Sequence, residues 1–141
     1  ELRAIVLSTL LRPEPGTRVV GFKEIRWQYP DLEDYLAFLR LLFPSARFVF
    51  NTRNHADVVN SQDGRRRPEG WWREGEEALK EVARVEGLQL AACEALGDAA
   101  YHVHYDDYVA DPTTLRGLFA WLGEEFDEER VRRVMSVRHS Y

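Results

Sequence analysis

The sequence contains few of the features that mark specialised protein classes. One cysteine, Cys93, stands in 141 residues, so no disulfide can form within the chain, and we expect a cytoplasmic protein. No apolar run approaches the ~18 residues that a membrane span needs, and no signal peptide is visible. The formal net charge is -5, which argues against nonspecific binding of nucleic acid. What remains is an ordinary globular composition.

Apolar patterns predict one α/β domain over residues 1–141. Helical spacing alternates with short apolar runs that are typical of buried strands, and the alternation indicates a parallel sheet flanked by helices. Helices are predicted over 2–11, 31–43, 55–62, 74–96, 111–123 and 127–135, and strands over about 18–23, 46–51 and 99–105.

Polar residues stand where each predicted strand ends, and ligands of open α/β sheets bind at that edge. These places are Lys23-Glu24, Asn51 to Arg53, and His104-Tyr105. The guanidinium of Arg53 could offer a fork of donors to a phosphate, with Ser61 about two helical turns further on. Alternatively, Arg53 pairs with Asp57 at helical spacing and Ser61 is incidental.

Two segments resemble motifs of the PAPS-dependent sulfotransferases. "RNHADVVNS", from Arg53 to Ser61, is similar to that family's 3′-phosphate motif, Arg-Asn-x-x-Asp-Val-x-x-Ser. "VHYDDYVADP" resembles the family's segment Tyr-Glu-Asp-Leu-x-x-Asp-Pro, with Tyr105 at its first position. The resemblance covers most of residues 18 to 135 in the family's order, and it implies a P-loop NTPase-like sulfotransferase fold.

The resemblance also implies a donor and its binding residues. PAPS (3′-phosphoadenosine 5′-phosphosulfate) would be the donor, and Arg53 and Ser61 would bind its 3′-phosphate. Tyr105 would approach the adenine, with core packing as the alternative. Transfer to a hydroxyl or amine of a small molecule or glycan would require a base and positive charge.

Glu24 and Lys23 are candidates for those two catalytic roles, although a surface Lys-Glu pair explains them equally well. Ile25 stands where one form of the family pattern has histidine, so Glu24 is the candidate base. We expect no metal site, because His102 and His104 share a strand face without a third ligand at a useful spacing.

The family's glycine-rich N-terminal loop for the 5′-phosphosulfate has no counterpart in the sequence, whose nine glycines are scattered. We therefore expect the larger C-terminal part of an enzyme, completed by an N-terminal segment on the same or another chain, or covered in a homodimer. The alternatives are a non-catalytic nucleotide-binding or assembly module and a relative of the P-loop kinases.

Overall fold

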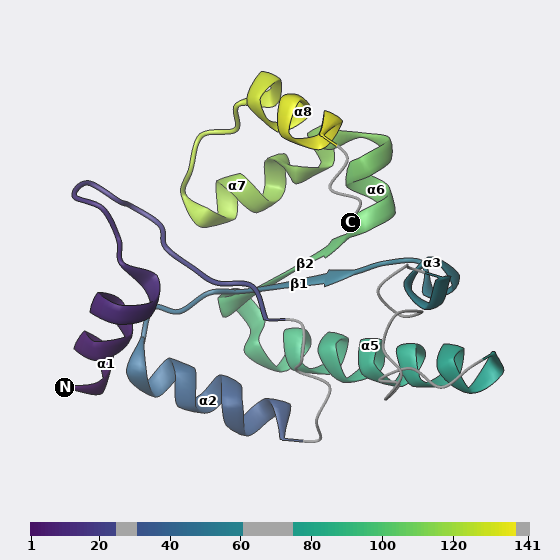
Figure 1. Cartoon of the computed structure of the whole chain (residues 1–141), viewed down its shortest axis with the longest axis horizontal. Helices are drawn as coiled ribbons and strands as arrows, with labels where there is room; N and C mark the ends of the chain where they lie inside the picture. Colours follow the sequence, from purple (N-terminus) through teal and green to yellow (C-terminus); the bar gives the residue numbers. More distant parts are fainter. Residues whose placement is uncertain (25–30, 61–74, 138–141) are drawn as a thin grey trace. The chain divides into compact units, whose positions relative to one another are not determined.

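The computed structural model describes residues 1–24, 31–60 and 75–137. The chain divides into two compact units, Glu1–Ala46 and Arg47–Tyr141 (Figure 1). Among the described residues, no helix combines the length and the apolar character that crossing a membrane requires.

The first unit is built from two helical segments. Helix α1 (Leu2–Ile5) continues as the π-helical η1 (Val6–Leu11), and α2 spans Leu32–Leu42. On α2, Leu32 and Leu36, four residues apart on one face of the helix, are buried. Both helices confirm the predictions for these stretches.

The predicted strand at residues 18–23 was wrong. Within the described parts of the chain, the sheet contains only residues of the second unit, and residues 18–23 have no regular secondary structure. Val19 and Phe22 are 51% and 59% exposed. An apolar run favours a strand only where a neighbouring strand pairs with its backbone, and the described sheet supplies none here.

A two-stranded parallel sheet forms the centre of the second unit. β1 (Phe48–Thr52) pairs with β2 (Ala100–His104), and the register sets Phe48 opposite Ala100 and Thr52 opposite His104. The strands and their order confirm the predicted α/β class. Parallel pairing requires a long crossover, and the chain between the strands includes α3 (His55–Asn60) and α5 (Glu76–Leu96).

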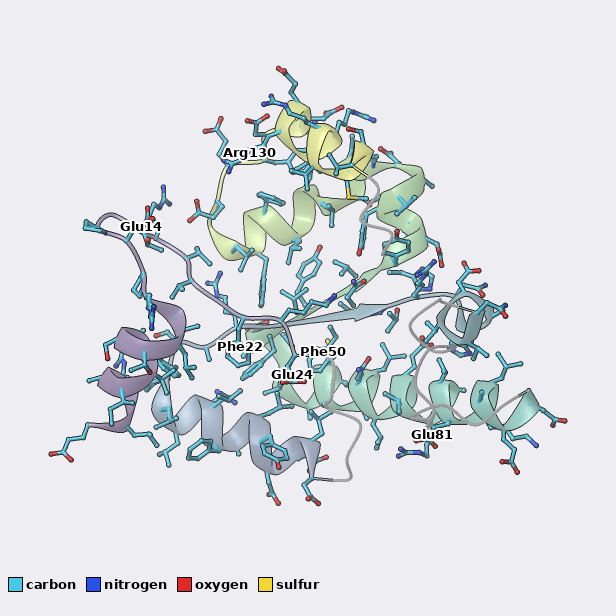
Figure 2. The ribbon with its side chains drawn as sticks, in the orientation of Figure 1. Glu14, Phe22, Glu24, Phe50, Glu81 and Arg130 are labelled. Atoms are coloured by element: carbon cyan, nitrogen blue, oxygen red, sulfur yellow. The ribbon has the colours of Figure 1, made fainter. Side chains whose placement is uncertain are left out.

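Helix α5 covers one side of this sheet, and α6 to α8 lie on the other (Figure 1). Alternate residues of β1 are buried, and Phe50 points from the strand toward α5 (Figure 2). The helix supplies four small or β-branched buried residues to this core: Ala78, Val82, Val85 and Ala92. The alternation places the apolar side of β1 against the helix.

The chain after β2 forms short helices whose ends carry strong local signals. They are α6 (Tyr105–Ala110), η3 (Pro112–Leu115), α7 (Arg116–Leu122) and α8 (Glu128–Ser136). The carboxylate of Asp111 accepts from Thr113 N at 3.0 Å and caps η3, and that of Asp127 accepts from Arg130 N at 2.9 Å and caps α8. Gly123 ends α7 with a φ of 76°, as predicted.

Candidate functional site at the carboxyl ends of the strands

The carboxyl ends of β1 and β2 lie side by side, because Thr52 and His104 are partners in the parallel register. The residues that follow, Arg53 and Tyr105, therefore leave the sheet at the same edge. Helix α3 begins shortly after the first and α6 begins at the second. The ends of two predicted strands therefore lie together at the edge where ligands bind in open α/β sheets, as predicted.

The guanidinium of Arg53 stacks on the ring of Tyr105, with Cζ 4.6 Å from the ring centroid. Its Nη2 is 4.0 Å from Oδ2 of Asp57, and the two side chains are 40% and 53% exposed, so this ion pair contributes little. The Nε of Arg53 is buried and has no hydrogen-bond partner among the described residues. A buried donor without an acceptor is costly unless a ligand satisfies it. Tyr105 therefore holds the guanidinium of Arg53, whose side chain is 40% exposed and can offer charged donors to an anion.

Asn54 caps α3 with its side chain and links the end of β1 to the start of α6 with its backbone. Its Oδ1 accepts from the N–H groups of Ala56 and Asp57, at 3.0 and 3.3 Å, and so caps α3. Its own N–H donates to Oδ2 of Asp106 at 3.0 Å. The same carboxylate oxygen lies 3.6 Å from Nδ1 of His104. The backbone next to Arg53 is thereby fixed to the start of α6.

A second tyrosine contacts the ring of Tyr105. Tyr108 packs edge-on against it, with centroids 5.4 Å apart and an interplanar angle of 75°. The hydroxyl of Tyr108 accepts a hydrogen bond from Nδ2 of Asn51 at 2.9 Å. Burial raises the pKa of Tyr108, and the Asn51 hydrogen bond and the Arg53 charge act in the opposite direction. The phenol is therefore neutral at neutral pH.

The histidines of β2 have separate partners. His102 Nε2 lies 2.8 Å from the hydroxyl of Thr52, while His104 lies beside Asp106. Another histidine, His55 of α3, has Nε2 3.2 Å from Oε2 of Glu86 on α5. No cluster of three or more His, Cys, Asp or Glu side chains that could hold a metal ion occurs in residues 1–24, 31–60 and 75–137.

The structure brings together two of the residues predicted to bind the nucleotide, Arg53 and Tyr105. Ser61 lies outside the described residues. Lys23 and Glu24 belong to the first unit, where both are exposed and lie in a segment without regular secondary structure. Their catalytic roles stay predictions.

Three residues of the site received no individual role from the sequence: Asn51, Asp106 and Tyr108. Asn51 stands among the polar residues at the end of β1, and Asp106 occupies the acidic second position of the Tyr105 segment. Those positions were the available signals. Only the folded geometry pairs Asn51 with Tyr108 and Asp106 with Asn54.

Comparison with known proteins agrees with the two motifs. A model described as "Sulfotransferase family" matches residues 2–128, which is most of the chain. Searches of curated proteins and of solved structures found no match.

Proposed function

Because the chain belongs to the sulfotransferase family, we propose that it transfers a sulfuryl group from PAPS to a hydroxyl or amine of a small molecule or glycan. The observation that carries the choice of donor is the buried Nε of Arg53, which stands at the ligand edge of the sheet and has no hydrogen-bond partner in the part of the chain that the structure describes. A phosphate oxygen would accept from this N–H and from the neighbouring Nη groups in a charge-assisted pair.

The residues at this edge fit the 3′-phosphate of PAPS. Arg53 supplies a fixed positive charge, and Ser61 adds a hydroxyl donor from the same motif. Tyr105 supports the guanidinium on one face and presents an aromatic ring suited to an adenine base. When bound, PAPS supplies the sulfuryl group that is transferred.

Two further residues carry the proposed chemistry. Glu24 takes the proton of the acceptor's hydroxyl or amine, since attack on sulfur requires that this proton leave. Lys23 stabilises negative charge on the oxygens of the group in transfer. Both side chains are exposed and therefore reachable by substrates. Glu24→Gln and Lys23→Ala should each lower kcat in a PAPS-dependent transfer assay, with little effect on nucleotide affinity.

Calorimetric titration tests the donor site. Adenosine 3′,5′-bisphosphate and adenosine 5′-monophosphate are titrated into the protein and into its Arg53→Ala variant. The wild type should prefer the bisphosphate, and the variant should lose about ten- to a hundred-fold in bisphosphate affinity, the value of a hydrogen bond to a charged group. Affinity for the monophosphate should change little, since it lacks the group that Arg53 binds.

Arg116→Ala is the matched control. Arg116 also stacks on an aromatic ring, with Cζ 4.6 Å from the centroid of Phe126, but it lies at the start of α7 rather than at the strand ends. This variant should keep the preference for the bisphosphate. A wild-type protein that binds both nucleotides equally, or an Arg53→Ala variant that keeps the preference, would show that the 3′-phosphate site is wrong.

A further inference from the structure

We propose that Tyr108 and Asn51 are positioning residues that fix the ring of Tyr105, and through it the guanidinium of Arg53, so that selectivity for a 3′-phosphate depends on this pair. The identity of the ligand in this proposal rests on the proposed function. The proposal adds two residues that do not themselves contact the phosphate.

The contacts form one continuous series from strand to cation. Asn51 Nδ2 donates to the hydroxyl of Tyr108 at 2.9 Å, and Tyr108 packs edge-on against Tyr105 with centroids 5.4 Å apart. The ring of Tyr105 then carries the guanidinium of Arg53 on its face at 4.6 Å. Asn51 lies in β1 and Arg53 directly follows this strand, so the series begins and ends on the same chain segment.

The series matters because, among the described residues, the other charged contact of the arginine is weak. The Asp57 carboxylate stands 4.0 Å from Nη2 and is largely solvated, so it is a weak restraint. Without the stack, the rotatable bonds of the long side chain would let the guanidinium explore many orientations, and binding would have to restrict them. A ring locked by its own neighbour removes much of that entropic cost before the ligand arrives.

Position 108 is also a place where this sequence departs from the pattern that it resembles. Position 108 corresponds to leucine in the family pattern Tyr-Glu-Asp-Leu, and this chain has tyrosine there. A leucine would fill the space but could not accept from Asn51. The tyrosine hydroxyl therefore gives Asn51, on the exposed face of β1, an acceptor that a leucine would not provide.

Two substitutions separate the hydroxyl from the ring. Tyr108→Phe keeps the edge-on ring and removes the acceptor of Asn51, whereas Tyr108→Leu installs the residue of the family pattern and removes both. The affinity ratio between adenosine 3′,5′-bisphosphate and adenosine 5′-monophosphate should fall about two- to ten-fold in Tyr108→Phe, the equivalent of an ordinary hydrogen bond. It should fall further in Tyr108→Leu.

The ratio distinguishes positioning from a general structural effect, because a damaged fold would weaken both nucleotides alike. Coupling is measured by repeating Tyr108→Phe in an Arg53→Lys background, where no guanidinium remains to be positioned. There the substitution should leave the ratio unchanged. An equal loss in both backgrounds, or a loss shared by both nucleotides, would overturn the proposal.

A matched control exists in the same unit. Arg116 stacks on Phe126 at 4.6 Å, and Phe119 packs edge-on against Phe126 with centroids 5.3 Å apart, so this cluster repeats the arrangement away from the strand ends. Phe119→Leu should leave the nucleotide ratio at its wild-type value. A fall as large as that in Tyr108→Phe would also overturn the proposal.

A measurement without ligand separates this inference from the proposed function. The Nε–H proton of Arg53, held over the face of Tyr105, should show a ring-current upfield shift in the NMR spectrum of the free protein. Tyr108→Phe should move that resonance toward the position of an unstructured arginine. If the wild type shows no preference for the bisphosphate but the resonance behaves this way, the proposed function fails and the positioning stands. An unchanged resonance in Tyr108→Phe refutes the positioning itself.

Discussion

Replacing Gly117 by alanine tests how tightly α7 packs on β2, the strand that leads to Tyr105. A Cβ at position 117 would overlap the hydroxyl oxygen of Tyr101, whereas the next ring atom, Cζ, would be 3.5 Å away, an ordinary contact. Tyr101 is not free to swing aside without loss, because its ring packs on Trp121 with centroids 5.4 Å apart.

Two opposing terms decide the sign of the change in stability. Alanine is favoured over glycine in a helix interior by about 0.8–1.0 kcal/mol. Overpacking against a fixed ring costs about 1–3 kcal/mol. Gly117→Ala should therefore lower the free energy of unfolding by about 1 kcal/mol, taking the middle of that range. In a Tyr101→Phe background the overlapping oxygen is gone, and the same substitution should stabilise the protein by about 0.5–1 kcal/mol.

Urea unfolding of the four proteins in this double-mutant cycle measures the coupling, which should be about 2 kcal/mol. Gly87→Ala is the control, since a Cβ there, within α5, would meet nothing within 4 Å. It should stabilise the protein equally in both backgrounds. If Gly117→Ala behaved like Gly87→Ala while Tyr101 is present, the proposed contact between α7 and β2 would be refuted.

Two further predictions concern side chains that hold the segment after β2. Asp106→Ala removes the acceptor of the Asn54 N–H and should lower the free energy of unfolding, measured in urea, by about 1 kcal/mol. Asp106→Asn retains an acceptor oxygen and should recover part of this loss in the same assay. The N–H and hydroxyl of Thr113 donate to the carboxylate of Asp111 and lower its pKa below the usual value of 3.8. The stability that these two hydrogen bonds contribute is therefore complete above pH 3.8, and it is lost as the pH falls through the lower pKa of the folded state. Thermal melts between neutral and acidic pH should show Asp111→Ala converging with the wild type only at the acidic end; a difference that stays constant with pH would contradict this assignment.

The sequence predicted elements whose signals are local. A short apolar run predicted β1, and helical spacing predicted α2, α5 and α8 close to their observed bounds. The prediction of a strand at residues 18–23 failed because an apolar run does not show whether a neighbouring strand is present to pair with it. Helix α6 was missed because its six residues, Tyr105–Ala110, are too few for a helical period to stand out from the end of β2.

The site was predictable to the level of backbone position. Parallel strands present their carboxyl ends at one edge of a sheet, and this rule alone is enough to bring Arg53 and Tyr105 to the same place. The stack between them and the Asn51–Tyr108 hydrogen bond depend on side-chain rotamers, which a sequence pattern does not encode. The same holds for the Nε of Arg53, which has no partner among the described residues.

The register of the sheet is what makes this site possible. Arg53 and Tyr105 each stand one residue beyond a paired position, Thr52 and His104, so the alignment of β1 with β2 sets the distance between cation and ring. The alternation in β1 buries Phe48, Phe50 and Thr52, and a slip of β1 by one residue would turn these toward solvent. The burial of this face against α5 therefore also fixes the position of Arg53, because a register that moved Arg53 would expose the buried residues of β1.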